Sequence, residues 1–153
     1  MPESTCCLFI KSCILVALSL LTISAMAAET TRISVSSSGK QGNKSSHLDN
    51  SINANGRYLA FDSDATNLVA GDTNSVPDIF VHDRQTKQTT LVSIASSGKV
   101  GNHESHSPSI SADGRFVAFQ SFASNLVASD TNGAPDIFVH DRQTKRTTLV
   151  SIA

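Results

Sequence analysis

The chain is poor in several residue types that whole classes of protein require. It has 153 residues, no tryptophan and one tyrosine, and aromatic residues make up only 5% of it. Lys and Arg number 12 against 13 Asp and Glu, so a formal net charge of -1 offers no field to attract nucleic acid or an anionic membrane. Eight glycines and four prolines are too few for a collagen-like or low-complexity chain. We therefore expect one ordinary domain at most, with no nucleic-acid partner.

Cysteine is confined to the first part of the chain, at Cys6, Cys7 and Cys13. An apolar, uncharged run over residues 13–28 follows Lys11 and ends in a small-x-small pattern at residues 25–27. This layout is typical of a secretory signal peptide, and the run is shorter than the about 20 apolar residues that span a membrane. We predict a signal peptide over residues 1–28, with an uncleaved anchor or a cytosolic start as alternatives.

Cleavage after that segment would leave a mature chain, residues 29–153, without any cysteine. Such a chain cannot use a disulfide, a cysteine nucleophile or a thiolate metal site. We expect this part of the protein to be periplasmic or secreted, to be held together by packing alone, and to touch no membrane beyond the signal segment.

The mature chain contains one sequence unit written twice. Residues 52–95 align with residues 110–153 at a constant shift of 58, and 33 of these 44 positions are identical. The upstream residues repeat as well, so we place the first unit at about 37–95 and the second at 96–153. Residues 30–35 (TTRISV) resemble the end of a unit, and they predict one further strand that could pair in a neighbouring repeat.

Each unit predicts four short strands. In the first unit they are expected at residues 51–53, 57–63, 78–82 and 89–94, and in the second at 109–111, 115–121, 136–140 and 147–152. Asn55-Gly56 and Asp113-Gly114 predict type I′ hairpin turns between the first two strands. The apolar residues of the strands do not alternate with polar ones, which indicates sheets covered on both faces. Small sheets of this kind are the blades of a β-propeller.

The segment PSISADGRFVAFQS, residues 108–121, resembles the repeat of TolB-like, WD-related bacterial β-propellers. The following residues, up to the end of the second unit, resemble the remainder of that blade. The resemblance implies an all-β fold: two four-stranded antiparallel blades of an incomplete propeller ring, preceded by the signal peptide.

A closed propeller contains about four to eight blades, and this chain supplies two. Three arrangements are therefore open. The chain could be a fragment of a larger propeller, it could form a homo-oligomer that completes the ring, or it could exist as a two-blade sandwich. Apolar blade faces and unpaired strand edges are unfavourable in water, so we expect the isolated chain to aggregate or to form oligomers.

A polar loop in both units carries oxygen side chains at positions 1, 3 and 7, as in part of a calcium-binding loop. The candidate calcium ligands are Asp72, Asn74, Asp78, Asp130, Asn132 and Asp136. Calcium prefers six to eight oxygen ligands, but no side-chain oxygen occupies position 5 and no glutamate follows at position 12. The alternative is a polar turn in which Asp and Asn bind their own backbone. Calcium is the one cofactor that the sequence suggests.

Histidine occurs mostly at matched positions of the two units. His82 and His140 each precede an aspartate at the end of a strand, and we predict a structural role for them because a catalytic group needs one special environment. His47 aligns with His106, so the same argument applies to that pair. His103 and His106 have a spacing that resembles a metal motif, but no helix is predicted there to present them.

No motif of an enzyme is present. The sequence lacks the Gly-x-Ser-x-Gly elbow of serine hydrolases and any glycine loop that binds phosphate. We predict a non-catalytic module of the cell envelope that binds a protein or a glycan, or acts as a scaffold, through the segments 39–49 and 98–108. The alternative is the propeller portion of a larger secreted hydrolase, a peptidase or a glycoside-active enzyme, whose catalytic part lies elsewhere.

Overall fold

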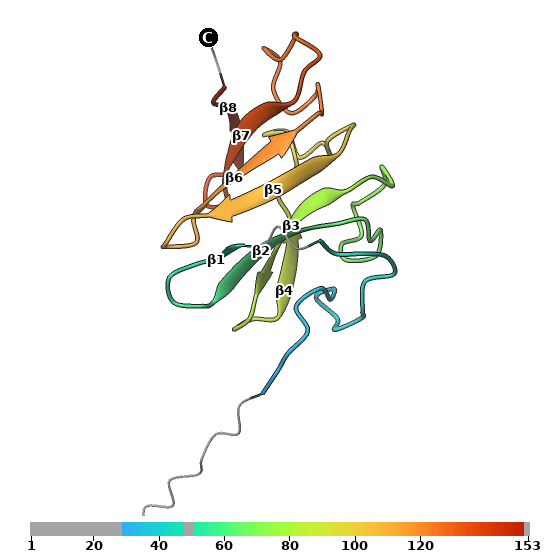
Figure 1. Cartoon of the computed structure of the whole chain (residues 1–153), viewed down its shortest axis with the longest axis vertical. Helices are drawn as coiled ribbons and strands as arrows, with labels where there is room; N and C mark the ends of the chain where they lie inside the picture. Colours follow the sequence, from blue (N-terminus) through green and yellow to red (C-terminus); the bar gives the residue numbers. More distant parts are fainter. Residues whose placement is uncertain (1–28, 48–50, 152–153) are drawn as a thin grey trace, which may run out of the picture. The chain divides into compact units, whose positions relative to one another are not determined.

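The computed structural model describes residues 29–47 and 51–151, which form eight β-strands and, within those ranges, no helix (Figure 1). The first four strands are β1 (Ser51–Ile52), β2 (Tyr58–Ser63), β3 (Asp78–Asp83) and β4 (Gln88–Leu91). The other four are β5 (Ser105–Ile110), β6 (Phe116–Ser121), β7 (Asp136–Asp141) and β8 (Arg146–Leu149). The predicted signal peptide, residues 1–28, lies outside the described residues. No described segment forms an apolar helix long enough to span a membrane.

The strands make two antiparallel sheets in chain order, β1-β2-β3-β4 and β5-β6-β7-β8, which we call blade one and blade two. Both belong to one structural unit, Thr31–Ala153. The register is the same in each blade, with Ala60 opposite Val81 in blade one and Ala118 opposite Val139 in blade two. The predicted all-β fold of two four-stranded antiparallel blades is therefore confirmed.

The hairpin turns differ from the predicted type I′. A type I′ turn needs positive φ at both central residues, but here only the glycines have it, with φ of 71° at Gly56 and 78° at Gly114. The Gly56 N–H donates to the Asn53 carbonyl (2.9 Å), which matches a type I turn that ends in a left-handed glycine. Asn55 stays at negative φ, where its Oδ1 accepts the Arg57 N–H at 3.0 Å. The prediction of a type I′ turn was wrong because the Asn55 side chain accepts a hydrogen bond from the backbone of the turn and so stabilises a different turn type.

Residues 30–35 do not form the predicted strand. Val35 pairs only locally, across a tight turn, with Gln41. The matching residues of blade one, Thr89–Leu91, are a strand because they pair with β3. A strand requires a partner of this kind, and the described residues offer none to 30–35.

The core consists of two apolar clusters, one on each face of blade one. The larger fills the interface between the two blades, which we call the junction. It contains Ala60, Ile79, Val81, Val92, Ile110, Val117, Phe119, Ala123, Leu126 and Phe138. The smaller one contains Phe61, Ala65, Leu68 and Phe80, with Ile33 packed against it. Consecutive residues of a strand point to opposite faces, so the burial of both Ala60 and Phe61 shows that blade one is covered on both sides.

Blade two is covered on one face only. Ile79 and Val92 in the junction are 0% and 1% exposed, whereas the same side chains at the same register in blade two, Ile137 and Val150, are 42% and 51% exposed. Phe116 on this side of the sheet is 39% exposed. We call the surface formed by Phe116, Ile137, Val139 and Val150 the outer face of blade two.

The paired positions give a test of the junction as the main source of stability. We expect Ile79→Ala to lower the free energy of unfolding by about 2–5 kcal/mol, because it leaves a cavity in the junction. At low protein concentration, Ile137→Ala should lower the free energy of unfolding by less than half as much, because the Ile137 side chain is already partly exposed to water. Urea unfolding of both variants measures the two losses, and equal losses at every concentration would contradict the account.

Candidate metal sites

Each blade contains an Arg–Asp pair that joins its second strand to the end of its third. The Arg57 guanidinium donates to both carboxylate oxygens of Asp83, at 3.0 and 2.7 Å, and Arg115 does the same to Asp141, at 3.1 and 2.7 Å. The hydrogen bonds from these arginines hold the pKa of each aspartate well below its usual range. These groups are therefore tied into the fold of each blade.

The repeated histidines have a structural role as well. His82 Nδ1 lies 2.9 Å from the Thr89 hydroxyl, and His140 Nδ1 lies 2.9 Å from the Thr147 hydroxyl. Each contact joins the third strand of a blade to the fourth. Burial lowers the pKa of both histidines, which favours the neutral ring at neutral pH. His82 and His140 therefore make the interstrand contacts that a structural role requires.

Two of the three candidate calcium ligands of the first unit are buried carboxylates with free oxygens. Asp72 is 7% exposed and Asp78, at the start of β3, is 0% exposed. Neither oxygen of Asp72 has a hydrogen-bond partner among the described residues, and neither does Oδ2 of Asp78. The Ser93 hydroxyl donates to the other oxygen of Asp78 at 2.5 Å. Burying a charge is costly. The backbone of Asn74 and the charge of Lys44 offset part of this cost at Asp72, and a cation near the free oxygens would offset more of it.

Burial also changes the acidity of these two carboxyl groups. It raises the pKa of Asp78 to about 6, an effect that the nearby charge of Asp72 strengthens and the Ser93 hydrogen bond opposes. It raises the pKa of Asp72 too. Both carboxyl groups therefore hold a proton more readily than they would in water.

Asn74, the third candidate, is used differently. Its amide donates to the Gly101 carbonyl of the loop that leads into blade two (2.9 Å), and its Oδ1 accepts the Val76 N–H (3.2 Å). The side chain thus closes a polar turn and links the blades. The structure buries Asp72 and Asp78 and uses Asn74 to close the turn and to link the blades.

The second unit has the polar-turn arrangement throughout. Asp136 accepts hydrogen bonds from the Ser151 hydroxyl (2.5 Å) and from the Asn132 amide (2.9 Å), so both of its oxygens are satisfied. Asn132 Oδ1 accepts the Ala134 N–H at 2.9 Å, and Asp130 is partly exposed. The copies differ in that the Asn74 amide donates to the Gly101 carbonyl and only weakly stabilises the charge of Asp78, whereas the Asn132 amide donates to Asp136 at 2.9 Å. The geometry therefore favours calcium at the first loop over the second.

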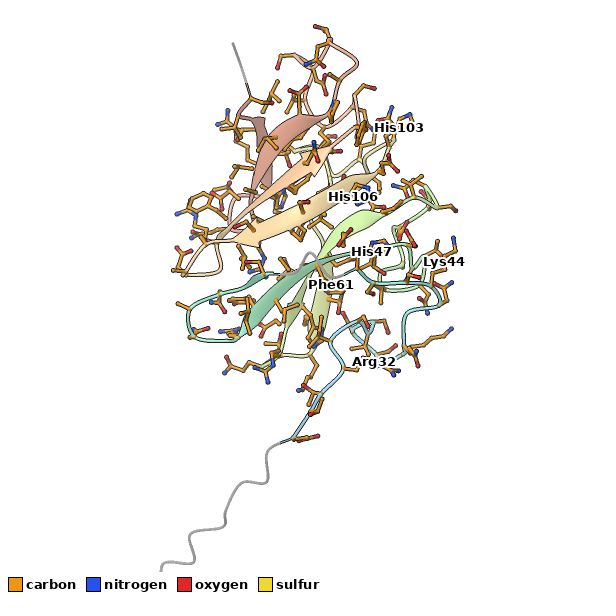
Figure 2. The ribbon with its side chains drawn as sticks, viewed as in Figure 1. Arg32, Lys44, His47, Phe61, His103 and His106 are labelled. Carbon is orange, nitrogen blue, oxygen red and sulfur yellow. The ribbon has the colours of Figure 1, made fainter. Side chains whose placement is uncertain are left out.

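A third cluster lies at the junction, where two histidines meet one carboxylate. Oδ2 of Asp62 is 2.9 Å from His47 Nδ1 and 3.0 Å from His106 Nδ1. Figure 2 labels these two histidines, which come from residues before β1 and from β5 and approach each other at the junction. Asp62 lies on β2, and its side chain is 2% exposed. His103 does not belong to this group of ligand atoms.

Sequence reasoning missed this cluster because it treated the aligned histidines as separate copies of one structural residue. Asp62 was the available signal, since the matching residue of the second unit is Gln120. The three residues are distant in sequence and meet only when β5 of blade two packs beside β2 of blade one.

The first testable consequence concerns calcium. We expect millimolar calcium, compared with chelator, to raise the melting temperature, because the ion would neutralise the free oxygens at Asp72 and Asp78. Linkage gives about 2.7 kcal/mol when free calcium is a hundredfold above its Kd. Asp72→Asn should abolish this shift in differential scanning calorimetry, while Asp130→Asn, the matched variant of the second loop, should keep it. A melting temperature that does not respond to calcium would refute the site.

The second consequence concerns pH in calcium-free buffer. The pKa of Asp78 is higher in the folded state (about 6) than the ordinary 3.8, so the folded state holds this proton more tightly than the unfolded one. The contribution of Asp78 is most favourable below pH 3.8, and it declines as the pH rises to about 6. Asp78→Asn should remove this decline from the stability–pH curve measured by chemical unfolding. An unchanged slope between pH 4 and 6 would contradict the assignment.

The chain is similar to solved β-propeller proteins. No family model and no curated protein matches it. TolB from Acinetobacter baumannii is similar over 71% of this chain and 21% of its own, with 19% identity and a TM-score of 0.44. The tricorn protease is similar over 74% of this chain and 14% of its own, with 15% identity and a TM-score of 0.48. The chain thus spans about a fifth of the first structure and about a seventh of the second, and its own two stacked sheets have the fold of propeller blades.

Proposed function

We propose that the protein is a non-catalytic β-propeller module, exported to the periplasm or beyond, that acts by binding a protein partner through the open face of its second blade. The outer face of blade two is the observation that carries this proposal. It presents the same apolar side chains that blade one buries in the junction, yet Ile137 and Val150 remain about half exposed. The signal-peptide pattern of residues 1–28 supports export.

The junction indicates what kind of partner fits this face. Blade two covers blade one there, and the two units are identical at 33 of 44 aligned positions. Blade one of another copy carries nearly the same strands as the blade that already fits. On its side away from the junction Ile52 is 53% exposed, and Ile33, which packs on the Phe61 and Phe80 cluster, would have to move aside. We identify the partner as a second copy of this chain, packed head to tail.

Contacts between arginine side chains and an aromatic ring at the junction support this partner. The Tyr58 ring has the Arg57 guanidinium 4.7 Å from its centre and Arg142, from blade two, 4.3 Å from it. The matching ring of blade two, Phe116, has only Arg115 over it (4.7 Å) among the described residues. The residue that matches Arg142 in blade one is Arg84, which is exposed.

Arg84 is already held in the required position. Its guanidinium donates to the Gly56 carbonyl at 2.9 Å, as that of Arg142 donates to the Gly114 carbonyl at 2.5 Å. Arg84 of one copy can therefore cover the open side of Phe116 in the next. A head-to-tail contact of this kind repeats until the ring closes.

The experiment is to measure the mass of the protein in solution over a range of concentrations. We expect sedimentation velocity to show association that Ile137→Asp abolishes, because a carboxylate in the contact would lose its water without gaining a partner. Ser97→Asp, which adds the same charge to an exposed loop, should associate like the wild type. A compact monomer at every concentration, or equal association of Ile137→Asp, would overturn the proposal.

A further inference from the structure

We propose that His47, Asp62 and His106 bind a divalent transition-metal ion such as Zn²⁺, one per chain, at the junction between the blades. One ligand atom from each residue lies within 4.8 Å of the others. Two imidazole nitrogens and a carboxylate oxygen suit zinc, which binds such ligands at about 2.0–2.2 Å in a tetrahedral arrangement. Three protein ligands leave the fourth position for water or an exogenous ligand.

The distances in the cluster are close to those of a metal site. Tetrahedral bonds of about 2.0–2.1 Å hold two ligand atoms roughly 3.3 Å apart. The distances from Asp62 Oδ2 to His47 Nδ1 and His106 Nδ1 are 2.9 and 3.0 Å. These two pairs need an outward shift of a few tenths of an ångström, and the two histidine nitrogens, which lie within 4.8 Å of each other, would close toward the ion. The histidine side chains are 39% and 31% exposed, which provides a path for it from solvent.

Asp62 is the feature that points to a bound cation. Its side chain is 2% exposed, and its Oδ1 has no hydrogen-bond partner among the described residues. A carboxylate in such a place needs a compensating charge. The two histidines contact only its other oxygen, so they leave part of this need unmet.

The other nitrogens of the histidines also face carboxylates. His47 Nε2 lies 3.5 Å from Asp64 Oδ2, and His106 Nε2 lies 3.9 Å from Glu104 Oε2. Histidines that bind a metal usually donate their second N–H to a carboxylate or a carbonyl, which orients the ring and strengthens the ligand. Both rings are thus arranged with one nitrogen toward the shared Asp62 and the other toward an outer carboxylate.

The carboxylates of this cluster occur only once in the chain, although the histidines occur in both units. Where the first unit has Asp62 and Asp64, the second has Gln120 and Phe122. Glu104 takes the place of Ser45. Residues that serve the folding of every blade would be repeated, whereas these three distinguish a single junction. The stoichiometry should therefore be one ion per chain, even if copies associate through the outer face of blade two.

The site would also hold the blades together. His47 and Asp62 belong to the first unit, and His106 lies on β5 of blade two. An ion shared by these ligands binds only when the junction is formed, so it stabilises the folded state.

Cobalt binding to the full chain tests the proposal. We expect Co²⁺ to give visible d–d absorption that saturates at one equivalent through this site and is displaced by Zn²⁺. Asp62→Asn and His106→Ala should lose that equivalent, while His103→Ala, which removes a nearby histidine outside the cluster, should keep it. The three cysteines are the same in all of these proteins, so any ion they bind cancels in the comparison. Asp64→Asn should weaken binding about tenfold or more.

A second measurement avoids dependence on variants that fail to fold. In the wild-type protein, zinc should shift the Nδ1 resonances of two of the five histidines in long-range ¹H–¹⁵N spectra. Asp62→Asn that folds by circular dichroism and still binds cobalt like the wild type would overturn the proposal. So would wild-type spectra in which no histidine Nδ1 responds to zinc, because the cluster would then be a hydrogen-bonded network alone.

Discussion

Packing of blade two against blade one buries Ala60, Ile79 and Val81, side chains that a four-stranded sheet alone would leave in water. A small sheet with apolar residues on both faces cannot satisfy both of them by itself. The first blade meets this constraint on one side with the second blade, and on the other with its own loop and Ile33. The polar contacts between the blades and the candidate metal sites depend on how these apolar faces are buried.

Polar contacts follow from the same packing. The Ser105 N–H donates to the Pro77 carbonyl at 2.9 Å across the junction. The Asn74 amide donates to a carbonyl of the next loop, and Asp72 and Asp78 keep oxygens without a hydrogen-bond partner among the described residues. His106 reaches Asp62 only because β5 lies beside β2. The two candidate metal sites are therefore properties of the junction as well as of the sequence unit.

The strands of the sheets could be predicted well from the sequence because each strand occurs in both repeats, so its boundaries can be compared between the two copies. β2, β3 and their copies begin and end within one residue of the predicted limits. The failures concern interactions that a linear pattern does not contain. The turn at Asn55 depends on a local side-chain hydrogen bond, and residues 30–35 lack the partner that makes the matching segment a strand.

The candidate sites show the same division. The spacing of Asp72 and Asp78 predicted a calcium site, and the structure adds that both carboxyl groups are buried. No spacing predicted the convergence of His47, Asp62 and His106, because it arises between blades. In the sequence, the only sign of this cluster is that Asp62 of the first unit corresponds to Gln120 of the second. That difference can be interpreted only when the neighbouring blade is in place.

The central claim, that a blade face is stable only under a neighbour, can be measured residue by residue. Strands β3 and β7 share the sequence DIFVHD, so their unprotected amides exchange at nearly the same intrinsic rates. Hydrogen exchange followed by NMR at low protein concentration should show β3 exchanging much more slowly than β7, because β3 is covered on both faces. Equal protection of the two strands would contradict the account.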